Sequence, residues 1–300
     1  MKIIRDAGNA GDRVIALGTF DGVHLGHQAL LAAGKSYARE HGALLRACSF
    51  DRHPLEVLRP AAAPKLLTTL QEKTELMDRC GVDELQLIPF TRETAGMEPE
   101  EFLRMLRETV CVKALVAGWN YTFGKGGRGN ADMLREDGEK NGYSVMIVPP
   151  VMAGGEAVSS TLIRKSLKEG RILEAGEFLG HPYELRGAVT ETGTGTTPAR
   201  VDPGERKQLP ASGVYPCRMV TESGTRAAVA TISDGTESGR QEVFIDVPEG
   251  ADGLQGQEIR LIPGDRLHAP RDSGSPEETE ARAAEDRRQA MAFLEAARGE

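Results

Sequence analysis

Hydrophobic residues between positions 13 and about 150 form short runs rich in β-branched residues, separated by longer segments of helical period. The runs expected to form strands are 13–20, 43–50, 83–90, 113–118 and 143–150. The helical segments between them are 27–40, 68–80, 98–108 and 131–142. This alternation predicts an α/β domain, a Rossmann-like parallel sheet with helices on its faces.

Boundary residues support the helical segments. Thr69 and Glu72 have the spacing of a capping box, and Pro99 stands where a proline in the first turn of a helix is tolerated. Two further helical segments, 159–170 and 171–180, follow before the sequence HPY at 181–183 interrupts the pattern.

After Tyr183 the pattern changes to short strands separated by Gly, Pro, Ser and Asp, at 184–190, 213–220, 226–232, 241–247 and 257–263. Closely spaced strands with turn residues between them predict a small antiparallel β-barrel. Ser275, with Glu278 three residues later, begins a charged C-terminal helix that runs to Ala297. We therefore expect a first domain at 1–184 and a second at 185–300.

Composition narrows the class of protein. The 300 residues carry a formal charge of −8, which disfavours general binding to nucleic acid. The chain lacks the apolar run of roughly 18 residues that a membrane span needs, and its N-terminus lacks the apolar core of a secretory signal. The four cysteines are far apart, so we expect buried, reduced thiols. These features predict a cytoplasmic protein with no membrane partner.

The first chemical motif is the segment Gly18–His27, GTFDGVHLGH, between the first strand and the first helix. Ligands of open α/β sheets bind at the carboxyl ends of the strands, where the N-terminus of a helix attracts phosphate. His24 and His27 lie three residues apart, so both imidazoles can point donors at one anion. Gly26 leaves space between them for a nucleotide. An alternative is that the histidines only cap the helix.

A second motif, VSSTLIR at 158–164, begins another helix. Its hydroxyl residues are typical of capping alone. Arg164, about one turn later, instead favours a clamp for the β- and γ-phosphates of a nucleotide.

Two loops complete the set. The segment 118–129 contains G-x-G-x-x-G at Gly124, Gly126 and Gly129, but it lacks the later acidic residue of a dinucleotide site and the G-K-[ST] of a P-loop. We interpret it as a flexible loop that folds over a phosphorylated ligand. In the segment 49–55, SFDRHPL, either Asp51 or His53 orders a substrate, or His53 and Pro54 form only a turn.

Together these motifs resemble the FAD synthetase module of the bacterial bifunctional riboflavin kinase/FMN adenylyltransferases. The resemblance covers residues 13 to about 185 and rests on LGTFDGVHLGH, SFDRHPLEVL, GWNYTFGKGGRG and VSSTLIRKSL, in the order and spacing of the family. Arg52 stands where the family usually has proline. The resemblance implies an H-x-G-H nucleotidyltransferase that moves AMP from ATP to FMN with Mg²⁺, giving FAD and pyrophosphate.

The resemblance also implies roles for individual residues. His24, His27 and Arg164 are the implied catalytic residues. The implied ATP-binding residues are Gly18, Phe20, Asp21, Gly26, Ser160 and Thr161. The implied FMN-binding residues are Asp51, His53, Asn120, Tyr121, Phe123 and Lys125. No metal-ligating residue is assigned.

The second domain resembles the riboflavin kinase barrel only faintly. Glu242 stands where the family has its catalytic glutamate, but the family motif G-F-P-T-A-N is replaced by GTTPAR at 195–200. Thr197 lies in this degenerate motif, and Pro198 and Arg200 take the places of the threonine and asparagine that serve magnesium and ATP. Proline has no hydroxyl and arginine does not ligate a cation. We therefore expect kinase activity to be lost or weak.

Three alternatives to an FMN adenylyltransferase without kinase activity remain open. The first is a fully bifunctional enzyme, the second is an H-x-G-H nucleotidyltransferase with another acceptor, and the third is a flavin-binding regulator without turnover. The sequence fixes neither the oligomeric state nor the role of residues 185–300.

Overall fold

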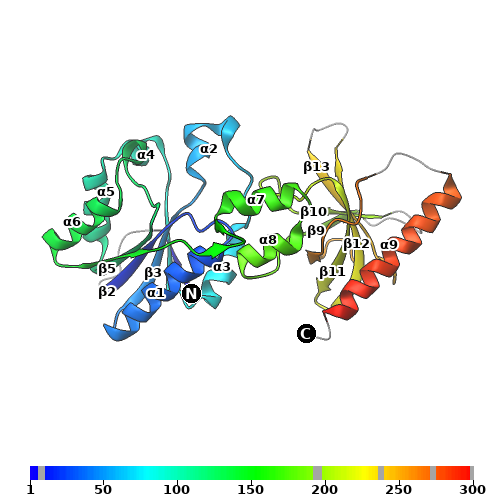
Figure 1. Cartoon of the computed structure of the whole chain (residues 1–300), viewed down its shortest axis with the longest axis horizontal. Helices are drawn as coiled ribbons and strands as arrows, with labels where there is room; N and C mark the ends of the chain where they lie inside the picture. The colour runs from blue at the N-terminus through cyan, green and yellow to red at the C-terminus, as the bar shows by residue number, and fades with distance from the viewer. Residues whose placement is uncertain (6–10, 192–197, 236–239, 271–274, 298–300) are drawn as a thin grey trace. The chain divides into compact units, whose positions relative to one another are not determined.

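The structure of the chain, a computed structural model, describes residues 1–5, 11–191, 198–235, 240–270 and 275–297. The chain divides into two compact units, Met1–Ser160 and Thr161–Glu300. Each unit has its own sheet and its own buried core (Figure 1).

A six-stranded sheet forms the centre of the first unit, with the strand order β1-β4-β3-β2-β5-β6. All neighbouring strands are parallel, as predicted. The strands are β1 (Lys2–Ile4), β2 (Asp12–Leu17), β3 (Leu44–Phe50), β4 (Glu84–Ile88), β5 (Cys111–Gly118) and β6 (Ser144–Val148).

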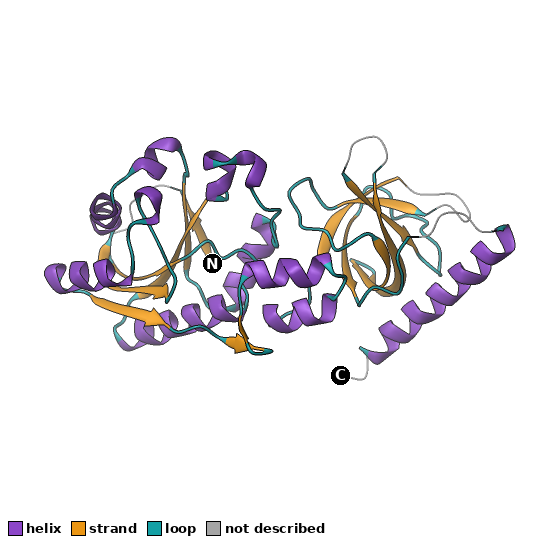
Figure 2. Cartoon of the chain, turned by 45° about the horizontal axis from the view of Figure 1, so that its top comes forward, coloured by secondary structure: helices purple, strands orange, loops and turns teal. Residues whose placement is uncertain are grey.

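Helices cover both faces of this sheet (Figure 2). On one face, Val14 of β2 belongs to a core shared with α1 (Leu25–Glu40) and α3 (Leu70–Arg79). On the other face, Ile15 belongs to a core shared with α5 (Pro99–Thr109) and α6 (Ala131–Asn141). Because both faces are buried, the central strands β2 and β5 each contain a continuous hydrophobic run rather than an alternating pattern.

The predicted helix caps are present. The Thr69 hydroxyl accepts from Glu72 N at 3.2 Å, and the Glu72 carboxylate accepts from Thr69 N at 2.7 Å. Pro99 is the first residue of α5. Short elements of the first unit that the pattern did not predict are the strand β1, the helices α2 (Pro54–Leu58) and α4 (Arg92–Gly96), the 3₁₀ helices η1 (Pro60–Ala62) and η2 (Lys125–Gly127), and the hairpin β7 (Met152–Ala153) with β8 (Glu156–Ala157).

The second unit begins within α7 (Ser160–Lys168), continues with α8 (Ile172–Leu179) and contains a closed antiparallel barrel. Its strand order is β10-β13-β12-β11-β14-β9, which confirms the predicted barrel. The strands are β9 (Leu185–Glu191), β10 (Ala199–Asp202), β11 (Gly213–Thr221), β12 (Gly224–Asp234), β13 (Gln241–Asp246) and β14 (Glu258–Pro263).

Backbone hydrogen bonds connect α7 and the turn after it to the barrel unit. Ala211 N donates to Leu167 O at 3.0 Å, and Arg266 N donates to Gly170 O at 3.1 Å. These bonds explain why α7 and α8 group with the barrel. The domain boundary between 184 and 185 stays a prediction from sequence.

The C-terminal helix α9 (Pro276–Ala296) packs against β11 and β12. Its Ala290 and Leu294 share a core with Val214 and Val229. The predicted cap is present, because the Ser275 hydroxyl accepts from Glu278 N at 3.2 Å.

Among the described residues, none of the helices combines the length and apolar character that crossing a membrane requires. Cys48 and Cys217 are buried and free, as expected. The expectation of buried thiols is wrong for Cys111, which is exposed because it begins β5 outside the core.

Candidate active site

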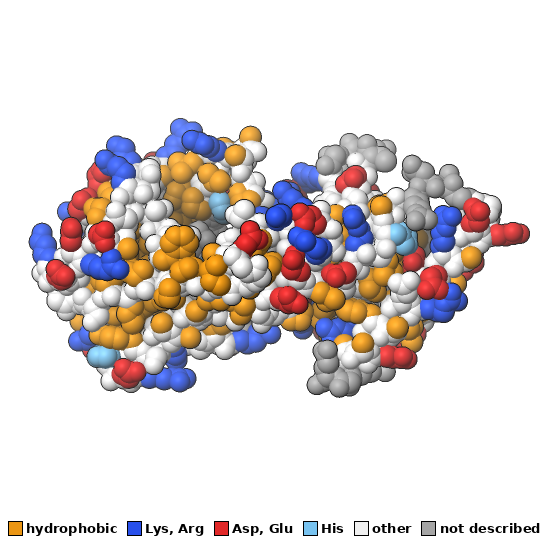
Figure 3. Space-filling model, viewed as in Figure 1, with side chains coloured by type: hydrophobic (Ala, Val, Ile, Leu, Met, Phe, Trp, Pro, Cys, Tyr) orange, Lys and Arg blue, Asp and Glu red, His pale blue; other side chains and the backbone are white. Residues whose placement is uncertain are grey.

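A cavity of about 690 Å³ lies at the carboxyl ends of the parallel strands in the first unit. Its lining includes the last residues of five strands, Leu17, Phe50, Ile88, Gly118 and Val148. Its volume is within the range of small-molecule sites. Figure 3 shows the hollow in the surface of this unit, bordered by hydrophobic side chains. The cavity therefore lies at the carboxyl ends of the strands, where the sequence predicted a ligand site.

The loop between β2 and α1 has an unusual backbone. Phe20 has a φ angle of 53° and Val23 one of 41°, and both side chains are fully buried. Positive φ is uncommon for residues other than glycine and is a strained conformation for a β-branched one. Burial of the two side chains holds this loop in a single conformation.

Hydrogen bonds from distant segments fix the same loop. Asp21 Oδ1 accepts from Leu67 N at 2.9 Å and from Thr68 N at 3.2 Å, and Gly22 N donates to Thr68 Oγ1 at 3.1 Å. The Ser160 hydroxyl donates to Asp21 O at 2.9 Å. Asp21 is 4% exposed and does not line the large cavity, so its carboxylate positions the loop.

Lys73 of α3 supports the loop from a second direction. Its Nζ donates to Thr19 O at 2.9 Å, and the Ser49 hydroxyl donates to the same oxygen at 3.0 Å. Burial lowers the pKa of Lys73, and Asp21 opposes this shift. The sequence pattern gives no signal for Lys73, because a lysine on an amphipathic helix is ordinary.

The two histidines of the first motif are brought together at the N-terminus of α1. His24 is the N-cap residue, and its Nδ1 accepts from His27 N at 3.4 Å. The two rings stack with centroids 3.7 Å apart and planes at 21°. His27 Nδ1 is buried and has no hydrogen-bond partner within the described part of the chain.

Burial controls the protonation of this pair. It lowers the pKa of His24 to about 4, against the opposing effect of Asp21. It also lowers the pKa of His27 well below its usual value, and the charges of His24 and Lys73 lower it further. Both imidazoles are therefore neutral at neutral pH. Because His24 Nδ1 is an acceptor, the ring proton of His24 is on Nε2.

Gly26 lies between the two histidines for a steric reason. A Cβ atom at this position would be 3.2 Å from the Cε1 and Nδ1 atoms of His24. Any side chain at Gly26 would therefore push the His24 ring from its place.

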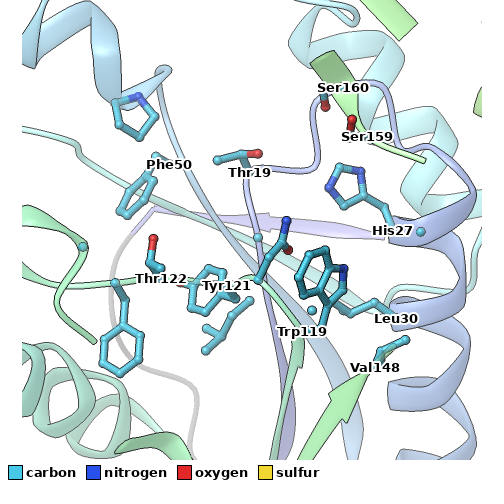
Figure 4. Close-up of a pocket in the computed structure, with 18 of the residues that line it drawn as sticks. Thr19, His27, Leu30, Phe50, Trp119, Tyr121, Thr122, Val148, Ser159 and Ser160 are labelled. Carbon is cyan, nitrogen blue, oxygen red and sulfur yellow. The ribbon is translucent and has the colours of Figure 1, made fainter. Parts of the chain in front are cut away.

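The predicted flavin-side residues Asn120, Tyr121 and Phe123 all line the same cavity. Aromatic rings gather there: Phe123 lies 5.7 Å from Phe102 and 6.0 Å from Tyr121, measured between ring centroids. Figure 4 shows Phe50, Tyr121 and Thr122 on this side and His27, Ser159 and Ser160 on the other. The cavity thus has an aromatic part and a part with imidazole and hydroxyl groups.

The loop at 118–129 needs glycine at position 124 for reasons of backbone angle and space. Gly124 has a φ angle of 69°, and a Cβ atom there would lie 2.8 Å from Pro99. Lys125, predicted to bind FMN, does not line the cavity, and its Nζ lies 3.6 Å from a Glu98 carboxylate oxygen. The same carboxylate pairs with Arg128.

Asp51 and His53 lie beside a smaller cavity of about 60 Å³, which Thr68 and Lys73 also line. Asp51 Oδ1 accepts from Phe90 N at 2.9 Å. His53 is the N-cap residue of α2, and its Nδ1 accepts from Leu55 N at 3.2 Å. The structure shows that His53 caps a short helix where the sequence offered a turn at His53 and Pro54, and the contact of His53 with FMN stays a prediction.

The other predicted residues divide between the units. Gly18 and Ser160 line the large cavity, whereas Phe20 lies beneath the loop. Thr161 and Arg164 lie on α7 in the second unit. In the barrel, Glu242 accepts from Arg200 Nη2 at 2.7 Å. Thr197 lies outside the described residues.

Several residues that line the large cavity received no role from the sequence, and Thr19, Phe50, Trp119 and Ser159 are among them. Each of these four residues lies within a predicted motif or next to one, so their closeness to the motifs in the sequence could have identified them. Within the described ranges, no group of three or more His, Cys, Asp or Glu residues is arranged to hold a metal ion.

A sequence model of the family described as FAD synthetase matches residues 7–162. The chain belongs to the FAD synthetase family. The bifunctional riboflavin kinase/FMN adenylyltransferase of Escherichia coli (strain K12) is 30% identical over 314 aligned positions, which cover 98% of both chains. The FAD synthetase of Listeria monocytogenes is 33% identical over 227 positions, which cover 75% of this chain and 89% of that one.

The fold of this FAD synthetase family member is also found in a solved structure. A crystal structure named as a macrolide-efflux protein from Streptococcus pneumoniae has a TM-score of 0.87 and 25% identity, and the match covers 97% of this chain and 99% of that one. Enzymes of the FAD synthetase family are FMN adenylyltransferases, whose substrates ATP and FMN are small molecules. The predicted family, fold class and enzyme class are confirmed.

Proposed function

We propose that this chain transfers AMP from ATP to FMN, giving FAD and pyrophosphate, and that its barrel does not phosphorylate riboflavin. The stacked pair of neutral imidazoles, placed in a pocket at the carboxyl ends of a parallel sheet, is the observation that carries the first part. The pairing of Glu242 with Arg200 supports the second part, the absence of riboflavin phosphorylation.

The transfer needs no side chain as a base. A phosphate oxygen of FMN, already ionised at neutral pH, attacks the α-phosphorus of ATP in line. A phosphorus–oxygen bond forms between FMN and AMP, and the bond from the α-phosphorus to the bridging oxygen breaks, so that its electron pair leaves with pyrophosphate. Positioning and charge stabilisation then supply the catalysis.

The histidines act on the α-phosphate as hydrogen-bond donors. His24 offers Nε2–H, because its Nδ1 is used as an acceptor. Bringing a phosphate to the pair favours protonation of an imidazole, since a nearby anion stabilises its charged form. By family resemblance, Ser160, which lines the same cavity, contacts the departing pyrophosphate.

Magnesium enters this proposal with the nucleotide. Among the residues that the structure describes, no cluster of three ligating side chains forms a protein cage, and Mg²⁺ is commonly held by substrate phosphates with few protein ligands. We therefore treat MgATP as the substrate and assign no protein ligand to the ion.

The barrel differs chemically from a kinase site. Glu242 stands where the family has its catalytic base, and its carboxylate accepts from the Arg200 guanidinium at 2.7 Å. Glu191 lies 3.8 Å from the same guanidinium. A carboxylate oxygen that already accepts a hydrogen bond from arginine has less capacity to accept one from a substrate hydroxyl.

A fully bifunctional enzyme is the second candidate. It is favoured by the Escherichia coli relative, which matches this chain over nearly its whole length and is named a bifunctional riboflavin kinase/FMN adenylyltransferase.

One paired assay separates the candidates. Purified protein is incubated with MgATP and either FMN or riboflavin, and the flavins are resolved by chromatography. We expect FAD and pyrophosphate from FMN and no phosphorylated flavin from riboflavin. FMN or FAD formed from riboflavin would establish the bifunctional alternative, and FMN binding without pyrophosphate release would establish the regulator.

A further inference from the structure

Trp119 has a large aromatic side chain that lines the cavity and is exposed to solvent. It directly follows β5, is the single tryptophan of the chain, and is 54% exposed while lining the 690 Å³ cavity. Its indole stacks on no aromatic ring within the described residues. Exposed apolar surface at the mouth of a pocket is typical of a ligand contact.

A backbone hydrogen bond fixes the position of Trp119 in the chain beside the cavity. Trp119 N donates to Val148 O at 3.0 Å, which ties the residue after β5 to the end of β6. The indole then has only two χ angles to order when it stacks on a ligand, so stacking costs it little conformational entropy.

The side of the cavity on which Trp119 lies identifies its ligand. Figure 4 shows its indole beside Leu30 and Val148 and near His27, away from Phe50 and Thr122. Under the proposed function, the histidines contact the α-phosphate of ATP, so the base of the same nucleotide, one ribose away, lies in the histidine part of the cavity. The aromatic part of the cavity around Phe123 is left for the flavin.

We propose that Trp119 stacks on the purine ring of ATP and sets the affinity for this substrate. This inference rests on the proposed adenylyl transfer. Stacking does not distinguish one purine from another, because every purine presents a flat π-face. We therefore expect GTP to compete with ATP for stacking on Trp119.

Steady-state kinetics with FMN and MgATP tests the inference. We expect Trp119→Ala to raise the KM for ATP at least about fivefold, as loss of one aromatic–base stack does elsewhere, while the KM for FMN stays within about twofold. Trp119→Phe retains a ring and is expected to recover most of the affinity. Leu44→Ala is the matched control, since Leu44 is 42% exposed at the opposite ends of the strands.

Fluorescence of the single tryptophan provides a second measurement that does not depend on turnover. We expect ATP to quench the emission of the wild-type protein, and tripolyphosphate, which has the phosphates but no base, to leave the emission unchanged while competing with ATP. Equal quenching by both compounds, or a raised KM for FMN alone in Trp119→Ala, would overturn the inference. If the wild type forms no FAD, the proposed transfer is wrong, whereas the quenching comparison still decides whether Trp119 meets the base.

Discussion

The imidazole rings of His24 and His27 stack at a centroid distance of 3.7 Å, one from the N-cap and one from the first turn of α1. Two imidazolium ions this close would repel each other, so the pair carries at most one proton at ordinary pH. Burial already favours the neutral rings. The pair therefore presents neutral donors in the free protein and gains charge only when a phosphate approaches.

The first prediction concerns stability against pH. Burial lowers the pKa of His24 from 6.5 to about 4, so the unfolded chain binds more protons than the folded one between these values. Stability is therefore complete above pH 6.5 and falls as the pH drops toward 4. The expected loss from this residue is about 2 kcal/mol between pH 7 and 5.

Urea unfolding of the first unit, followed by Trp119 emission, measures this loss. His24→Asn is the matched variant, because asparagine is a good N-cap residue and does not titrate. We expect the variant to lose less stability than the wild type over this pH range. Equal pH dependence in the two proteins would contradict the lowered pKa of His24.

The second prediction concerns His27. Its replacement by alanine removes one donor to the α-phosphate, and we expect the turnover with FMN and ATP to fall by about 10²- to 10³-fold. The fold is expected to persist, because His27 is only half-buried. Pyrophosphate release and thermal unfolding are measured on the same preparation.

His41→Ala is the control for this variant. His41 is the exposed residue at the other end of α1, where it stacks on Tyr37 at 3.8 Å. We expect its turnover to match the wild type. Turnover of His27→Ala close to that of the wild type would remove the proposed role of the pair.

The parallel sheet could be predicted from sequence because its strands are buried on both faces. Val14 and Ile15 enter the cores on opposite faces, so β2 is a continuous apolar run that is easy to recognise. β1 and β10 contain 3 and 4 residues, too few to show any period. Their positions depend on pairing with strands distant in the chain, which a local pattern does not contain.

The same distinction separates the site residues. His24 and His27 are three residues apart, so their spacing alone predicted that the two side chains lie on one side of the helix start, whereas the stacking of the rings is seen only in the structure. Lys73 contacts Thr19 across 54 positions, and only the fold brings them together. Lys125 looked like a phosphate contact within a glycine loop, but Glu98 from another segment lies beside it. Its role toward FMN stays a prediction.

The third prediction concerns Gly26→Ala. The new methyl carbon would lie 3.2 Å from the His24 ring, which must then move. We expect more than a tenfold fall in turnover with little loss of stability, because alanine favours a helix over glycine by about 1 kcal/mol. Gly176→Ala on α8 is the control, since its methyl carbon would meet His181 O at an ordinary 3.6 Å. Unchanged turnover in Gly26→Ala would show that the His24 position is not critical.

The fourth prediction concerns Glu242 in the barrel. Under the proposed function its carboxylate serves only the pair with Arg200, whose side chains are 29% and 43% exposed. Ion pairs of this exposure contribute about 0–1 kcal/mol, so Glu242→Gln is expected to change stability little. We also expect the variant and the wild type to behave alike with both flavins, forming FAD from FMN and no FMN from riboflavin.

Glu205→Gln is the matched control, because Glu205 also pairs with an arginine, Arg240, in the second unit. The decisive measurement is FMN formation from riboflavin and MgATP by all three proteins. If the wild type and Glu205→Gln form FMN while Glu242→Gln does not, Glu242 is a working base despite its pairing, because a carboxylate that only neutralises Arg200 has no effect on phosphoryl transfer. The barrel would then be an active kinase, and the loss inferred from Pro198 and Arg200 would be wrong.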